Sequence, residues 1–119
     1  MPLKSIYTYD DCTRAGDSYT RSLRYLKTED EPYNLTDYTF RAQLRESILS
    51  TDAVATFTCS SPDPIDGRID CTLSAEQTGS LVFKHKFKWY VFDVEVIDPS
   101  GKVSTIIEVN LKVNKGVTR

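Results

Sequence analysis

A strict alternation of apolar and polar residues near the C-terminal end constrains the fold of this chain most. One face of residues 107–113 carries only apolar side chains, those of Ile107, Val109, Leu111 and Val113. The preceding run has the same period of two, with Tyr90, Phe92, Val94 and Val96 on one face. Between the runs, Asp98-Pro99-Ser100-Gly101 has proline at the second position and glycine at the fourth, which is typical of a type I turn. A half-buried strand has this period, so the segment predicts a long β-hairpin.

The same alternation predicts further strands along the chain. Three clear ones are expected at residues 38–45, 53–59 and 68–73, and weaker ones at 5–9 and 19–26. In the clear strands we expect these side chains to point inward: Tyr38, Phe40, Ala42, Leu44; Ala55, Phe57, Cys59; Ile69, Cys71, Leu73. One place breaks the β pattern, because Ser74 followed by Gln77 fits a capping box. A single helical turn is therefore expected there.

Short strands separated by frequent turn signals indicate an all-β class. About seven strands predict an immunoglobulin-like antiparallel β-sandwich with one short helical turn. The Cys…Trp…Cys pattern of antibody domains is missing, and a small β-barrel is the alternative. A chain of 119 residues is long enough to bury a core without disulfides. We expect one domain over residues 1–119, with residues 1–10 as an extended N-terminal arm.

Composition argues against several kinds of partner. The net charge of −2 lacks the basic excess of a nucleic-acid-binding face, and it gives no polybasic membrane contact. The sequence holds no apolar run near the ~20 residues that a membrane-spanning helix needs, and we expect no signal peptide. Three cysteines, Cys12, Cys59 and Cys71, show no metal-binding spacing, so we expect free thiols and no metal or other cofactor. Cys59 and Cys71 lie on strands that we expect to pair.

No catalytic constellation is visible, and we expect that the chain is not an enzyme. The aspartates Asp63, Asp66 and Asp70 do not follow the 1, 3, 5 spacing of an EF-hand calcium loop, and a solvated turn explains them better. The single histidine, His85, has no nucleophile motif to act on. No glycine-rich phosphate loop is present either.

Several segments occur in a fixed order over nearly the whole chain: AGDSYT at 15–20, NLTDYTFRAQLR at 34–45, GRI at 67–69, LSAEQT at 73–78, YVFDVEV at 90–96, DPSGKV at 98–103 and VTR at 117–119. Together they resemble a family of small tailed-phage virion domains, similar to the N-terminal domain of phage upper-baseplate proteins. The chain departs from that pattern in three places. Asp37 stands where the family often has glycine. The segment at residues 79–89 is longer and more basic than the family's usual connection before the hairpin. Residues 106–109 stand where the family usually has the sequence LLEG.

The resemblance implies an immunoglobulin-like sandwich and a structural role without catalytic residues. The leading hypothesis is an adaptor in the tail, baseplate or fibre base of a bacteriophage. The alternatives are a head or neck decoration or completion protein, and a soluble module that binds a host surface or a carbohydrate. In the leading case the partners are other virion proteins, the copies form a symmetric assembly, and the location is the virion, or the host cytoplasm during assembly.

Aromatic side chains are the candidate partner contacts, because aromatic residues are enriched at interfaces. Phe83, His85, Phe87 and Trp89 lie in the extended basic segment, where lysines alternate with aromatic residues. Tyr7 and Tyr9 lie in the predicted N-terminal arm, which could add a strand to a neighbouring sheet.

Overall fold

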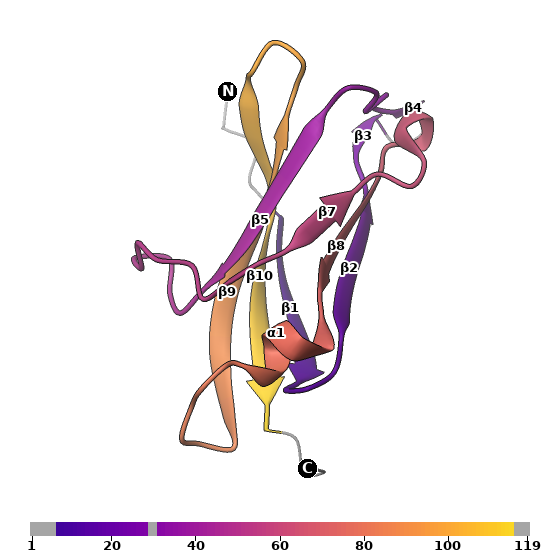
Figure 1. Cartoon of the computed structure of the whole chain (residues 1–119). Coiled ribbons are helices and arrows are strands. Elements are labelled where there is room, and N and C mark those ends of the chain that lie inside the picture. The colour runs from indigo at the N-terminus through magenta and orange to yellow at the C-terminus, as the bar shows by residue number, and fades with distance from the viewer. Residues whose placement is uncertain (1–6, 29–30, 116–119) are drawn as a thin grey trace.

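Two β-sheets pack face to face in the computed structural model, which describes residues 7–28 and 31–115 (Figure 1). The five-stranded sheet has the order β1 (Tyr7–Arg14), β10 (Val103–Asn114), β9 (Phe87–Ile97), β5 (Thr39–Arg45) and β6 (Ala55–Thr56). The three-stranded sheet has the order β2 (Tyr19–Arg24), β8 (Arg68–Leu73) and β7 (Thr58–Ser60). A small ribbon pairs β3 (Leu26–Thr28) with β4 (Glu31–Pro32). The predicted all-β sandwich is confirmed, and the sheets of the described residues do not close into the alternative barrel.

The β9–β10 hairpin forms as the alternation predicts. The inward side chains of both strands are buried, and they are the eight apolar residues named for these strands above. The turn closes with the Gly101 amide donating to the Asp98 carbonyl over 2.9 Å. The Asp98 carboxylate accepts hydrogen bonds from Ser100 and from the Lys102 amide, and these bonds hold its pKa below the usual value. A bulge between Thr105 and Ile107 restores the inward register of β10.

The first strand corrects the expected pairing. β1 extends to Arg14, and it runs parallel to β10 from Tyr7↔Ile107 to Arg14↔Asn114, so the sheets are not wholly antiparallel. Residues 7–10 of the expected N-terminal arm are therefore part of the sheet, at its edge. Residues 1–6 lie outside the described residues.

The expected strand at residues 53–59 is also corrected, because the chain changes sheets within it. β6 pairs with β5, whereas β7 pairs with β8, and Phe57 lies at the crossing. The Phe57 amide donates to the Ala42 carbonyl over 2.9 Å, and its ring is buried. That ring packs 4.4 Å from the Phe92 ring and edge-on to Tyr19, centroid to centroid 6.4 Å. These aromatic contacts join the two sheets through the core.

Short helical elements close the ends of the sandwich. Ser74 and Gln77 form the predicted capping box at the start of α1 (Ala75–Gly79). Thr78 of α1 is fully buried, and its hydroxyl donates to the Asp17 carbonyl over 2.7 Å and accepts from the Gly16 amide over 3.0 Å. At the other end lies the 3-10 helix η1 (Pro64–Asp66). The Asp37 turn keeps a left-handed φ of +67°, which aspartate tolerates better than most residues.

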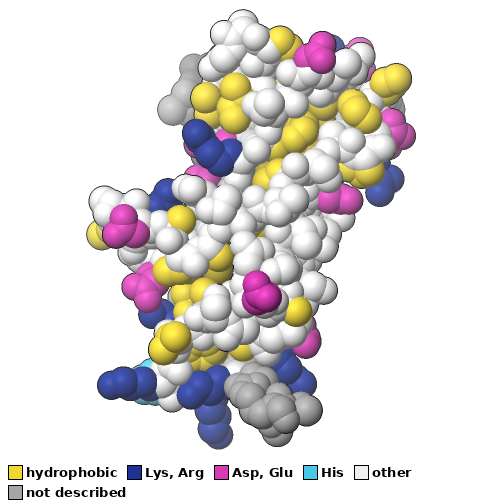
Figure 2. All heavy atoms as spheres, viewed as in Figure 1, with side chains coloured by type: hydrophobic (Ala, Val, Ile, Leu, Met, Phe, Trp, Pro, Cys, Tyr) yellow, Lys and Arg dark blue, Asp and Glu magenta, His cyan; other side chains and the backbone are white. Residues whose placement is uncertain are grey.

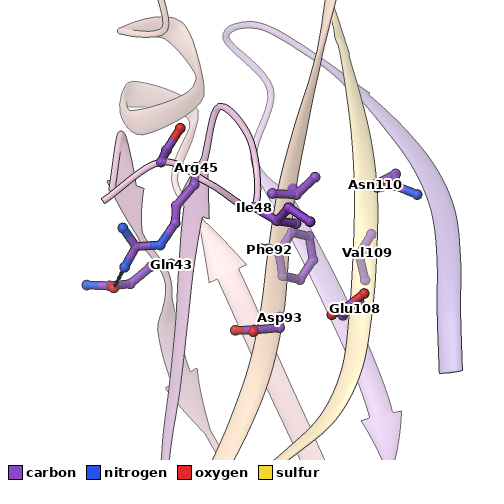
Figure 3. A pocket seen from close by; sticks show the side chains of 10 residues that line it. Gln43, Arg45, Ile48, Phe92, Asp93, Glu108, Val109 and Asn110 are labelled. Carbon is purple, nitrogen blue, oxygen red and sulfur yellow. Dashed lines mark hydrogen bonds between the residues drawn. The ribbon is translucent and has the colours of Figure 1, made fainter. Parts of the chain in front are cut away.

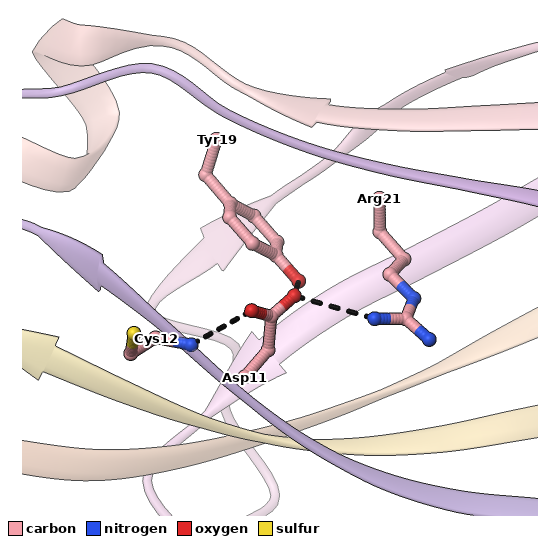
Figure 4. A network of polar contacts seen from close by, with 4 residues as sticks. All are labelled: Asp11, Cys12, Tyr19 and Arg21. Atoms are coloured by element: carbon pink, nitrogen blue, oxygen red, sulfur yellow. Dashed lines mark hydrogen bonds and ion pairs between the residues drawn. The ribbon is translucent and has the colours of Figure 1, made fainter.

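A polar network joins β1 to β2 along one side of the sandwich (Figure 4). The Tyr19 hydroxyl donates to Asp11 Oδ2 over 2.7 Å, and Arg21 Nη1 lies 3.3 Å from the same oxygen. Burial raises the pKa of Asp11, but the bonds from Tyr19 and from the Cys12 amide, with the Arg21 charge, outweigh it, and the net pKa is lowered. Burial and the same carboxylate raise the pKa of Tyr19. The network therefore favours an ionised Asp11 and a protonated Tyr19.

Candidate interaction surface

Three adjoining hollows run along the outer face of the five-stranded sheet, and together they form the outer groove. The central hollow, of about 310 Å³, lies between β5, β9, β10 and the loop at residues 46–54 (Figure 3). Its lining side chains include Gln43, Arg45, Ile48, Val91, Asp93, Glu108 and Asn110. A second hollow shares Gln43, Arg45 and Asp93 and adds Arg41 and Glu95. A third shares Ile48, Val91 and Asn110 and adds Asp10, Glu46 and Trp89.

The alternation that builds the core also builds this groove. Because Tyr90, Phe92 and Val94 point inward on β9, Val91 and Asp93 between them point outward. The partner strands have the same phase, so Gln43 faces Asp93 from β5 and Glu108 faces it from β10. Polar side chains from three strands therefore converge on one line across the sheet.

Two carboxylates meet at the centre of the groove without a cation between them. Asp93 and Glu108 are direct cross-strand partners, and neither takes part in a salt bridge among the described residues. The neighbouring Glu95 is paired, since Arg41 Nη2 lies 2.6 Å from its Oε1. Burial, together with the charges of Glu95 and Glu108, raises the pKa of Asp93. Like charges directly opposite each other destabilise a sheet, so this pair lowers the stability of the fold.

Arg45 is close to Asp93, but its hydrogen bonds go elsewhere. Its charge lowers the pKa of Asp93, against the larger effects of burial and the neighbouring carboxylates. Arg45 Nη2 donates to Gln43 Oε1 over 2.6 Å, and Nη1 donates to the Thr51 carbonyl over 2.7 Å. Arg45 thus holds the wall of the groove and leaves the Asp93 carboxylate open to a cationic group.

The loop at residues 46–54 displays two apolar side chains beside the groove. Ile48 is 78% exposed and Leu49 is 88% exposed. The loop is tied to the sheet at its base, where Lys88 Nζ lies 2.6 Å from Glu46 Oε2 and the Val54 amide donates to the Leu44 carbonyl. Figure 1 shows it projecting sideways from the sandwich between β5 and β6. Exposed apolar side chains of this kind are typical of protein-binding surfaces. Because the base of the loop is already held in place, binding a partner costs less loop entropy.

The predicted contact residues of the basic segment lie in different parts of the structure. Trp89 lies on the outer face, lines the groove and is 45% exposed. Phe87 lies two residues earlier on the same strand, with Lys112 Nζ 4.2 Å from its ring centre. Phe83 instead packs half-buried against the core. His85 is exposed in the connection between α1 and β9. Figure 2 shows Lys and Arg side chains gathered at the lower end of the molecule.

The two predicted N-terminal contacts lie on the edge strand β1. The Tyr9 ring is 39% exposed, and the Arg21 guanidinium lies 4.5 Å from its centre, so the ring packs toward β2. Tyr7 pairs with Ile107 through its backbone, and its side chain lies outside what the structure describes. Of the predicted contact side chains that the structure describes, only Phe87 and Trp89 therefore lie together on the outer face of the five-stranded sheet.

Sequence reasoning missed the centre and the rim of the groove. Asp93 and Glu108 occupied ordinary outward positions of an alternating pattern, and their pairing depends on the register of the hairpin. Ile48 and Leu49 did carry a signal, since two adjacent apolar residues between Ser47 and Ser50 are unusual in a polar loop.

The aspartate-rich turn is occupied by internal contacts. Asp63 caps η1, and Asp66 pairs with Arg24, whose Nη2 lies 2.6 Å from its Oδ1. Within residues 7–28 and 31–115, no group of three or more His, Cys, Asp or Glu side chains is arranged to hold a metal ion. Across the same residues, no helix has the length and apolarity needed to cross a membrane.

Comparisons with known proteins add no relative. A scan against protein-family models found no family that matches the chain, and a search of curated proteins found no match.

Proposed function

We propose that this chain is a non-enzymatic structural protein of a tailed bacteriophage virion, acting as an adaptor in the tail, baseplate or fibre base. The ordered motifs along nearly the whole chain support the virion role, and the sandwich is consistent with it. The observation that carries the adaptor role is the outer groove. It combines an anchored apolar tip with an open carboxylate pair, and such a combination suits a protein partner.

The groove suggests what the partner presents. Ile48 and Trp89 line the same hollow and supply apolar area beside the acidic centre. A matching segment would bring apolar side chains with a lysine or arginine directed at Asp93 and Glu108. Several copies held around a symmetry axis would gain strength through avidity, so each contact can be small.

A carbohydrate-binding module is the second candidate, and one observation favours it. The hollow beside Trp89 also contains Asp10 and Asn110, which lie within 3.0 Å of each other. An apolar ring beside convergent polar groups is a common design of small-molecule sites. In that case the isolated protein would bind glycans with measurable affinity, and it would be absent from purified particles.

Two matched substitutions test the adaptor role. Ile48→Asp alters the groove rim, whereas Ile65→Asp makes the same change at a residue of η1 that is similarly exposed, at 71%. Both proteins should fold, since neither side chain is buried. We expect Ile48→Asp to reduce incorporation into assembled particles at least tenfold, and Ile65→Asp to incorporate normally. Equal incorporation of the two variants would show that the outer groove does not bind the virion partner.

A further inference from the structure

Two cysteines face each other across the three-stranded sheet. Cys59 of β7 and Cys71 of β8 are direct cross-strand partners, and their Sγ atoms lie 3.5 Å apart. Cys71 is fully buried, whereas Cys59 is half-buried on the edge strand of the sheet. Both are free thiols, and neither takes part in the outer groove.

This arrangement suits a disulfide. A disulfide tolerates Cα separations of about 4.4–6.8 Å, which covers directly opposed residues in an antiparallel pair. The sulfur atoms must approach by about 1.5 Å to reach the bonded distance near 2.05 Å. β7 has only three residues and no strand on its outer side in the three-stranded sheet, so a local movement of this edge can supply that approach.

The two thiols differ in the way that an ordered reaction needs. The hydrogen bond between them lowers the pKa of Cys59 and, with burial, raises the pKa of Cys71. Cys59 is also the more accessible of the two. Thiolate character and access together determine which thiol reacts first, so Cys59 is the attacking group and Cys71 the resolving one.

We propose that Cys59 and Cys71 form an intramolecular disulfide when the protein meets a low-molecular-weight disulfide oxidant. The Cys59 thiolate attacks one sulfur of the oxidant RSSR, forms a mixed disulfide and releases RS⁻. Cys71 then transfers its proton to solvent, its thiolate attacks the Cys59 sulfur, and the second RS⁻ leaves. The two cysteines lose two electrons and two protons, and RSSR is reduced to two RSH.

The setting of the reaction follows from the redox compartment. A reducing cytoplasm keeps such a pair as thiols, and an oxidising medium closes it. That the closure follows release of particles from a host rests on the proposed function. The reaction itself does not, and it is therefore tested on the purified protein.

The test uses a Cys12→Ser protein, because Cys12 is exposed on β1 and would add its own reactions. The folded protein is incubated with glutathione disulfide and alkylated under denaturing conditions, and its intact mass is then measured by mass spectrometry. We expect the product to lose two hydrogens and both alkylation sites, with a peptide linking Cys59 to Cys71. A lasting glutathione adduct on Cys59, or two alkylated cysteines after prolonged oxidation, would overturn the proposal.

A matched pair of variants in the same background tests the order of attack. With Cys71→Ala, Cys59 should accumulate as the stable glutathione adduct, because the resolving thiol is gone. With Cys59→Ala, the buried Cys71 should react at least tenfold more slowly than Cys59 does. Faster reaction of Cys71 than of Cys59 in the folded protein would contradict the assigned roles. The formation of the disulfide is tested separately, by the linking peptide from the protein that keeps both Cys59 and Cys71.

Discussion

The substitution Gly67→Ala tests how tightly the chain closes at the η1 end of the sandwich. Gly67 has a left-handed φ of +71°, and a Cβ there would lie 2.5 Å from the Tyr25 carbonyl oxygen and 3.2 Å from that of Tyr33. These are backbone atoms, and Tyr25 cannot shift freely because its amide donates to the Gly67 carbonyl over 2.7 Å. The added methyl group must therefore displace the chain around η1.

Gly101→Ala is the matched control. Gly101 has a φ of +94°, further from the left-handed minimum than Gly67, but a Cβ there would meet no atom within 4 Å. Each substitution carries a dihedral cost of about 1–2 kcal/mol, offset in part by a smaller entropy loss on folding. Only Gly67→Ala adds the cost of overpacking, about 1–3 kcal/mol.

The free energy of unfolding, measured with urea and linear extrapolation, separates the two effects. We expect Gly67→Ala to be about 2 kcal/mol less stable than Gly101→Ala, with a midpoint lower by about 1 M urea. Equal midpoints would refute the reasoning, because they would mean that the Tyr25 and Tyr33 carbonyls do not enclose Gly67 as described.

Substitutions at three further positions test other contacts. Thr78→Val should cost about 2 kcal/mol or more of unfolding free energy, since it leaves the Gly16 amide and the Asp17 carbonyl without their partner, while Thr78→Ser should keep most of the stability. Asp11→Asn should cost about 1 kcal/mol at neutral pH. The folded pKa of Asp11 is lowered, so its contribution is complete above the ordinary value of 3.8 and is lost as pH falls through the folded pKa. In the acid range, the free energy of unfolding should therefore depend less steeply on pH for Asp11→Asn than for the parent. Asp93 has a raised pKa, so its ionisation reduces stability as pH rises from the ordinary value through the folded one. Asp93→Asn should thus be more stable than the parent at neutral pH by thermal unfolding, and less stable if Asp93 had an internal cationic partner.

The sequence predicted the elements whose signals are local. Alternation and the Asp98–Gly101 turn act within one hairpin, and the Ser74–Gln77 capping box acts within one helical turn, so each could be read without knowledge of distant residues. The inward-facing side chains of the strands could be predicted for the same reason, because side chains of a β-strand alternate between its two faces. Ile69, Cys71 and Leu73 are indeed fully buried.

The pairing of distant segments could not be read in this way. β1 lies beside a strand about 100 residues later, and period two does not distinguish a parallel partner from an antiparallel one. The change of sheet at Phe57 is accompanied by a hydrogen bond to the Ala42 carbonyl of β5, and no local pattern shows this contact between separate strands. The acidic centre of the groove was hidden for the same reason, since Asp93 and Glu108 meet only through the hairpin register.

The adaptor role is tested most directly by quantitative mass spectrometry of purified virions whose heads and tails have been separated. A tail adaptor is expected to follow the tail fraction at a fixed ratio to known tail proteins, and that ratio gives the copy number per particle. Presence in the head fraction would transfer the role to a decoration or completion protein. Absence from both fractions would contradict the structural role itself.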